Sequence, residues 1–158
     1  MRKKRSTPEE LRVAELVREA FRGVKLGNGV GLLQGQGLDD YEDERTLATY
    51  RAKDEKEDWS KIEPKDLNSC HSSLSFFDAE GMRFHLPAYL ISNLENTLEQ
   101  DIIFHLAYTV DSDFGKSMFS MLTLEQRTAV RAFLVLRLPE REFEREAIEH
   151  ALSVYWTD

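Results

Sequence analysis

The sequence predicts a single α+β domain that is mostly α-helical and contains one short β-hairpin. Three observations lead to this prediction. Most of the chain carries apolar residues at helical spacing, segment 74–86 alternates apolar and polar residues, and 158 residues is the usual size of one domain. Because a two-stranded hairpin alone is marginally stable, we expect it to pack against the helices or to gain a further strand.

The first predicted helix begins near residue 8. Thr7 can cap it, Pro8 suits the first helical position, and Glu10 completes a capping box. Apolar residues then recur on one face, namely Val13, Leu16, Val17, Ala20, Phe21 and Val24. Residues 1–7 are basic and predicted to be disordered, which leaves 8–158 as the globular domain.

The next region is rich in glycine and then in acidic residues. Because the glycines between residues 27 and 37 make regular structure costly, we predict a loop there, with one helical turn at most. Asp39 or Asp40 then caps a predicted helix that ends near Lys53. The polar segment 54–68 follows.

Segment 74–86 indicates a strand, a turn and a second strand. The strands are Leu74–Phe77 and Met82–Leu86, and residues 78–81 fit a type I turn. Phe84 and Leu86 alternate with polar neighbours, which predicts that both side chains point into the core. Pro87 is expected to end the second strand and to open the following helix.

The remainder of the chain is predicted to be helical. An apolar stripe indicates one long helix, through Ile91, Leu94, Leu98, Ile102 and Leu106, and a loop follows at 111–115. Thr123 and Gln126 form a second capping box. The helix they open is apolar nearly all round as far as Leu136, so we expect it at the centre of the bundle. A final helix carries Phe143, Ala147, Ala151 and Tyr155 on one face.

Composition argues against several functional classes. The net charge of −8 disfavours general nucleic-acid binding, which depends on basic patches. The continuous apolar runs are too short to cross a membrane, and no signal-peptide pattern follows the basic start. The single cysteine excludes an internal disulfide, so we expect a cytoplasmic protein. We expect no cofactor and no metal, because the glycine stretch lacks a phosphate-loop lysine and no ligand pair has zinc spacing.

Three residues are candidates for catalysis: Cys70, Asp78 and His85. A thiol–imidazole pair requires the two side chains to lie within hydrogen-bonding distance, and Cys70 could meet His85 across the predicted hairpin. A small hydrolase using these residues is therefore one alternative. A purely structural cysteine is the competing interpretation. The lack of a complete catalytic motif favours a non-catalytic function.

The negative charge is concentrated in one segment. Between Asp39 and Asp66 there are eleven acidic and six basic residues, a balance of −5. Complementary charge and aromatic anchors are typical of protein interfaces, so we predict a surface for a basic protein partner. It comprises Asp39, Asp40, Asp54, Glu55, Glu57, Asp58 and Trp59. The alternative is a solvated helix face with internal ion pairs. A homo-oligomeric structural protein, such as a homodimer, is favoured instead if the C-terminal aromatic residues are exposed.

The central block Ser73-Leu74-Ser75-Phe76-Phe77-Asp78-Ala79-Glu80-Gly81-Met82-Arg83-Phe84-His85-Leu86-Pro87-Ala88-Tyr89 resembles the signature of a family of uncharacterised small bacterial proteins. The flanking segments Gly27–Val30, Asp58–Trp59 and Leu122–Gln126 are also similar to that family. The resemblance implies a small bacterial domain of unknown activity and supplies no functional residues. Our leading hypothesis is a non-catalytic bacterial binding protein that occludes a basic partner, by analogy with immunity proteins.

Overall fold

The computed structural model describes residues 5–157, and every regular element in that range is a helix. The α-helices are α1 (Pro8–Ala20), α2 (Leu32–Asp39), α3 (Glu44–Lys53), α4 (Pro64–Ser69), α5 (Ala79–Leu94), α6 (Ile102–Tyr108), α7 (Asp113–Met118), α8 (Leu124–Arg137) and α9 (Arg145–Val154). Short 3-10 turns lie between them: η1 (Trp59–Lys61), η2 (Ser73–Ser75), η3 (Thr109–Asp111) and η4 (Leu138–Glu140). The predicted α+β class is therefore wrong, since residues 5–157 contain no strand.

The predicted hairpin is replaced by η2 and by α5, the longest helix of the described chain. Asp78 does not begin a turn but caps α5, where its Oδ1 accepts the backbone N–H of Gly81 at 2.8 Å. Phe84 and Leu86 are buried as predicted, but so is the intervening His85. Alternation of apolar and polar residues did not mark a strand here, because α5 is surrounded by protein on nearly every side and buries apolar and polar side chains alike. Pro87 lies inside this helix and ends no strand.

Four helix predictions also need correction. The helix predicted to begin at Asp39 or Asp40 begins at Glu44 with Asp43 as its cap, and Asp39 is instead the last residue of α2. The stripe from Ile91 to Leu106 belongs to two helices, α5 and α6, separated by residues 95–101. The expected loop at 111–115 forms the end of η3 and the start of α7. The central helix is α5 and not α8, because α8 exposes Leu124 and Val135 to solvent.

Both predicted capping boxes are confirmed. The Thr7 hydroxyl accepts the N–H of Glu10 while the Glu10 carboxylate accepts the N–H of Thr7, and Thr123 and Gln126 make the same exchange at the start of α8. Glu10 also forms a buried ion pair with Arg137 of α8 at 2.7 Å. The first and eighth helices are therefore joined by a charge pair as well as by apolar contacts.

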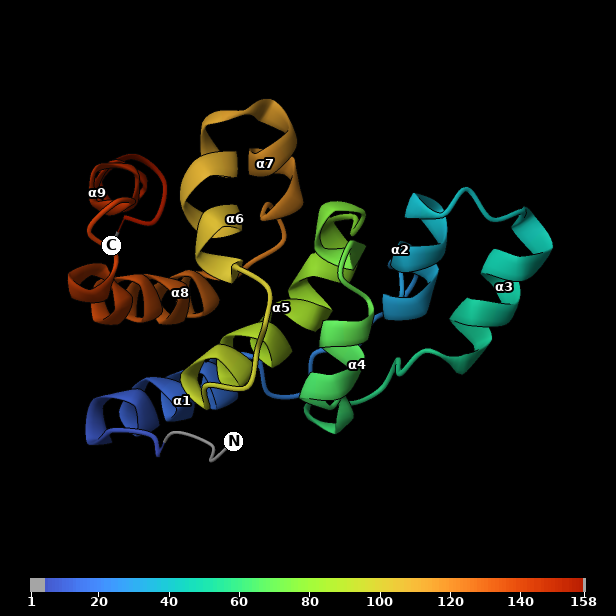
Figure 1. Cartoon of the computed structure of the whole chain (residues 1–158), viewed down its shortest axis with the longest axis horizontal. Helices are drawn as coiled ribbons and strands as arrows, with labels where there is room; N and C mark the ends of the chain where they lie inside the picture. The colour runs from blue at the N-terminus through green and yellow to red at the C-terminus, as the bar shows by residue number, and fades with distance from the viewer. Residues whose placement is uncertain (1–4, 158) are drawn as a thin grey trace.

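Figure 1 shows the arrangement of the helices. Helix α1 lies at the lower left of the view, α5 runs from beside it towards the middle, and α6 to α9 gather above α1 at the same end. The helices α2 and α3 lie side by side at the opposite end, and we call residues 31–54 the α2–α3 arm. Helix α3 packs against α2 and contains no buried residue, whereas α5 contains eleven. The arm therefore extends from the main body of the domain.

Candidate functional site

The α2–α3 arm is closed by a hydrogen-bonded contact between its two ends. Asp54 follows the last residue of α3, and its carboxylate accepts the backbone N–H groups of Leu33 at 2.7 Å and Gln34 at 3.2 Å. These N–H groups belong to the first turn of α2, where no helical partner is available to them. Asp54 thus acts as the N-terminal cap of a helix that precedes it in the chain.

Gly31 makes this cap possible. It occupies the position from which a side chain would normally cap α2, and a Cβ atom there would overlap the Asp54 carboxylate. The Gly31 N–H is instead satisfied by the side-chain oxygen of Gln34 at 2.9 Å. The glycine stretch is therefore a closely packed helix start, and the predicted loop extends only as far as this point.

A second glycine lets the two helices approach each other. A Cβ atom at Gly37 of α2 would lie 2.8 Å from a methyl group of Leu47 and 2.9 Å from the ring of Tyr50, both in α3. Leu47 and Tyr50 are only partly buried, yet they form the contact surface of α3. Close packing, not depth of burial, holds α3 against α2.

Basic side chains fasten the arm to the rest of the chain. The Arg51 guanidinium donates to the carbonyl of Gly27 at 2.7 Å. The Lys56 ammonium donates to the carbonyls of Asp54 at 2.7 Å and Arg51 at 2.9 Å, at the C-terminal end of α3, where carbonyls no longer receive the N–H groups of a following helical turn. These contacts fix the position of α3 without drawing it into the core.

The tip of the arm, residues 39–44, carries five carboxylates. None of them forms an ion pair with another described residue, although Asp43 caps α3 through the N–H of Thr46 at 2.8 Å. Tyr41 lies at the centre of the tip, is 95% exposed and has a φ of 58°. A left-handed conformation is unfavourable for a tyrosine, and the ring lies almost wholly in solvent.

The structure separates the predicted partner-binding residues into two groups. Asp39 and Asp40 lie at the tip, whereas the other five lie where the chain returns to the main body. Asp54 is buried at the start of α2, and the Trp59 ring lies in the core with its Nε1 donating to the carbonyl of Phe21 at 2.9 Å. The remaining three are engaged with their own chain, Glu55 with backbone N–H groups, Glu57 with Lys25 at 2.8 Å, and Asp58 with Ser60.

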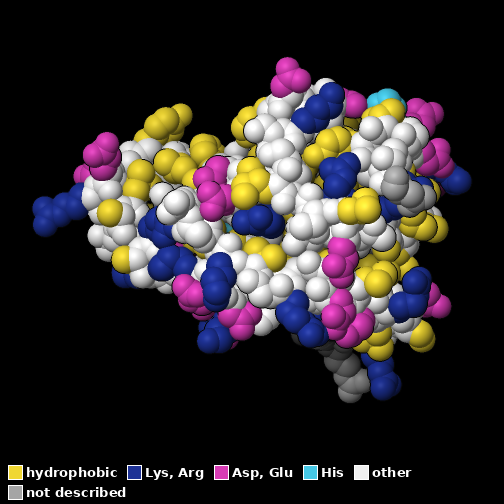
Figure 2. Space-filling view, turned by 180° about the vertical axis from the view of Figure 1, so that it is seen from behind, with side chains coloured by type: hydrophobic (Ala, Val, Ile, Leu, Met, Phe, Trp, Pro, Cys, Tyr) yellow, Lys and Arg dark blue, Asp and Glu magenta, His cyan; other side chains and the backbone are white. Residues whose placement is uncertain are grey.

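On one face of the molecule, the surface charges are mixed. On the face seen in Figure 2, acidic and basic side chains are interspersed among hydrophobic ones and do not form separate regions. The tip is therefore distinguished by the absence of basic side chains between residues 39 and 44.

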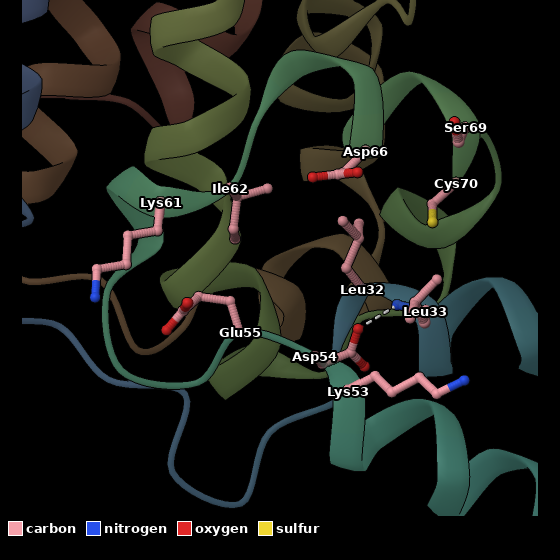
Figure 3. A pocket seen from close by; sticks show the side chains of 10 residues that line it. All are labelled: Leu32, Leu33, Lys53, Asp54, Glu55, Lys61, Ile62, Asp66, Ser69 and Cys70. Carbon is pink, nitrogen blue, oxygen red and sulfur yellow. Dashed lines mark hydrogen bonds between the residues drawn. The ribbon is translucent and has the colours of Figure 1, made fainter.

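A pocket of about 250 Å³ lies between α2, the end of α3 and α4. Its apolar wall includes Leu32 and Ile62, and Cys70 contributes its thiol (Figure 3). Burial raises the pKa of this thiol to about 11, and the carboxylates of Asp54 and Asp66 add to the effect. Burial also raises the pKa of the Asp54 carboxyl against the lowering effect of its two N–H donors.

The basic side chains of the pocket do not converge on one point. Lys53 and Lys61 line it, but Figure 3 shows their side chains pointing away from each other. The thiol of Cys70 is protonated at neutral pH and is a weak nucleophile for that reason.

The three predicted catalytic residues do not form a reaction centre. His85 is fully buried, and burial lowers its pKa to about 4. The Asp78 carboxylate accepts N–H groups from Gly81 and from Val30, at 2.8 and 2.9 Å. Within residues 5–157, no hydrogen bond joins any two of Cys70, Asp78 and His85.

Sequence reasoning missed Gly31, Arg51 and Lys56 as parts of the arm. The one local signal was Gln34, which stands three residues after Gly31 as it would in a capping box. The Asp54 cap could not be read from spacing, because its partners lie 20 and 21 residues away.

The described residues contain neither a metal-binding cluster nor a membrane-spanning helix. No group of three or more His, Cys, Asp and Glu side chains between residues 5 and 157 could hold a metal ion. Among the helices of that range, none is both long and apolar enough to cross a bilayer.

Comparison with known proteins identifies the family. The model of a family of unknown function, DUF6714, matches residues 9–158, and the chain therefore belongs to that family. No curated protein matches the chain, and no solved structure matches it.

Proposed function

We propose that this chain is a non-catalytic protein-binding domain whose recognition element is the α2–α3 arm, and that its partner presents a basic protein surface. The observation that supports the proposal most strongly is that α3 buries no residue in its own domain. The core of the domain is built without it.

Keeping α3 folded requires a dedicated set of contacts. An isolated helix of ten residues is marginal in water, because nucleation is unfavourable and few hydrogen bonds follow it. Here the Asp54 cap, the Arg51 contact and the Lys56 contacts hold the helix in one position. Such pre-organisation lowers the entropy lost when a surface binds a partner.

The chemistry of the tip indicates the partner. Five carboxylates that form no ion pair with another described residue favour a surface rich in lysine and arginine, and they accelerate association with it through electrostatic attraction. Tyr41 provides an exposed aromatic ring of the kind that often anchors an interface. Occlusion of a basic site on the partner is the mode of action that fits this geometry.

Photo-crosslinking tests where the partner binds. A benzophenone amino acid is placed at Tyr41 in one variant and at Phe143 in a matched control. Phe143 is 100% exposed and belongs to the turn before α9, at the other end of the molecule. We expect a protein that crosslinks from position 41 and not from position 143. Equal crosslinking from both positions would contradict the proposal.

Charge reversal then tests the chemistry with the captured protein. The triple variant Asp40→Lys, Glu42→Lys and Glu44→Lys should slow association at least tenfold at low salt, and added salt should reduce the difference, because exposed charges are screened beyond about 8–10 Å. Its control has the same change in net charge, made at the exposed residues Glu15, Glu99 and Glu142. If the control slows association as much as the tip variant, net charge and not the arm is responsible.

A further inference from the structure

Among the described residues, α5 contains three buried side-chain atoms without a hydrogen-bond partner: Nε of Arg83, Nε2 of His85 and the hydroxyl of Tyr89. The last two belong to fully buried residues, since His85 and Tyr89 are both 0% exposed. Buried polar groups are rarely left unpaired, because each such group loses its hydrogen bonds to water without replacement.

The hydrogen-bonding roles of these two atoms are complementary. Nδ1 of His85 lies 2.7 Å from the carbonyl oxygen of Gly81, which can only accept, so Nδ1 carries the proton. Burial keeps the ring neutral at neutral pH, which leaves Nε2 as an acceptor. Burial also raises the pKa of the Tyr89 phenol, so its hydroxyl remains a donor.

The two side chains lie on one side of α5. They are four residues apart, and residues at this spacing are neighbours along a helix face. The ring of Phe77 contacts both, stacking on His85 with centroids 4.3 Å apart and meeting Tyr89 edge-on at 6.3 Å. Phe84 meets the imidazole edge-on at 5.0 Å. Aromatic walls therefore separate both polar atoms from bulk solvent.

We propose that His85 and Tyr89 form an internal binding site for a single water molecule, which donates to Nε2 of His85 and accepts from the Tyr89 hydroxyl. Water supplies both roles at once, and buried waters typically make two to four hydrogen bonds to otherwise unsatisfied groups. A metal ion does not fit, because no third His, Cys, Asp or Glu of the described residues joins the pair. The site is independent of the arm and of its proposed partner.

The variant Tyr89→Phe tests the proposal through the sign of its effect. If the hydroxyl holds a bound water, its removal breaks a hydrogen-bonded bridge, and we expect Tm to fall by about 2–4 °C for a chain of this size. If the hydroxyl is unpaired, its removal relieves a buried unsatisfied group and Tm rises. A rise in Tm would overturn the proposal. Tyr155→Phe is the matched control, because its hydroxyl is exposed and makes only a 3.5 Å contact, and we expect no change in Tm.

An NMR experiment on the full chain detects the water directly. Magnetisation transfer from water to the His85 ring protons and to the Tyr89 hydroxyl proton should be observed in the wild type and lost at His85 in Tyr89→Phe. A direct hydrogen bond between the two side chains would give no transfer from water in either protein. That result would overturn the proposal even if Tm fell.

Discussion

Helices α3 and α5 are held in place by different physical means. Helix α5 buries eleven of its sixteen residues and is stabilised by apolar packing on nearly every side. Helix α3 buries none of its ten and packs on α2 at Gly37. It is further held by the Asp54 carboxylate, the Arg51 guanidinium and the Lys56 ammonium, which bind backbone groups of α2, of Gly27 and of the end of α3. Burial makes a helix part of the folding core. Polar contacts at one end of a helix fix its position and leave its outer face exposed to solvent.

The largest expected effect is a difference in unfolding free energy between a variant of α5 and a variant of α3. Phe84→Ala in α5 should lower the free energy of unfolding by about 3–5 kcal/mol, because it leaves a cavity in a fully buried position. Leu47→Ala in α3 should cost about 1 kcal/mol, since this side chain is only half-buried. Chemical denaturation of both variants measures the difference, and equal losses would show that α3 belongs to the core after all.

The second expected effect is a pH-dependent loss of unfolding free energy that arises from His85 in α5. It should amount to about 3 kcal/mol. The folded-state pKa of His85 is about 4 and its ordinary value is 6.5, so between these values the unfolded chain binds more protons. The stability that the neutral ring contributes is complete above pH 6.5 and is lost as the pH falls towards 4. His85→Phe should therefore show a flatter fall in unfolding free energy between pH 6.5 and 4. An unchanged slope would mean that the imidazole is accessible to bulk solvent.

Removing the Asp54 cap should affect the arm more than the core. Asp54→Ala leaves two N–H groups of α2 without an acceptor and should cost about 1–2 kcal/mol, a typical loss for a helix cap. Hydrogen exchange should accelerate at Leu33 and Gln34 and stay unchanged in the middle of α5. Uniform acceleration across both helices would mean that the arm and the core unfold together.

A double-mutant cycle tests the relation between Gly31 and Asp54. Gly31→Asp alone should destabilise, because its Cβ would overlap the Asp54 carboxylate. In the Asp54→Ala background the same change should cost less or even stabilise, since the new side chain can cap α2 locally. Denaturation of the four proteins measures the coupling energy between the two positions. Additive effects would contradict the idea that a side chain at position 31 and the Asp54 carboxylate are alternative caps for α2.

The smallest expected effect lies at the tip of the arm. Tyr41→Gly should raise the free energy of unfolding by up to about 1 kcal/mol, because glycine adopts a φ of 58° without strain and the exposed ring has little packing to lose. The same variant should weaken binding to any protein captured through position 41. A stability loss would show that the ring packs on the arm.

Local sequence signals predicted the helix starts better than they predicted the fold class. The Thr7–Glu10 and Thr123–Gln126 boxes are complete within four residues, and both were read correctly. The hairpin prediction failed because alternation at Met82, Phe84 and Leu86 cannot distinguish a strand from a helix that is buried all round.

The arm could be predicted only in part. The acidic character of residues 39–44 is evident in the sequence, whereas the roles of Asp54 and Trp59 depend on distant partners. Asp54 was assigned to a partner-binding surface because its neighbours are charged. Its place beneath α2 follows from the room that Gly31 leaves, which no periodic pattern encodes.

The reciprocal fit of Gly31 and Asp54 has an evolutionary consequence. A side chain at position 31 and a carboxylate at position 54 would compete for the same space, so substitution at one position changes what is tolerated at the other. Members of the family that carry serine, threonine or aspartate at the first position should carry a small residue at the second. An alignment of the family should then show these two columns varying together, although 22 residues separate them in the chain. Where both columns change, the two helices of the arm lose their shared carboxylate, and their relative orientation becomes free to diverge between lineages.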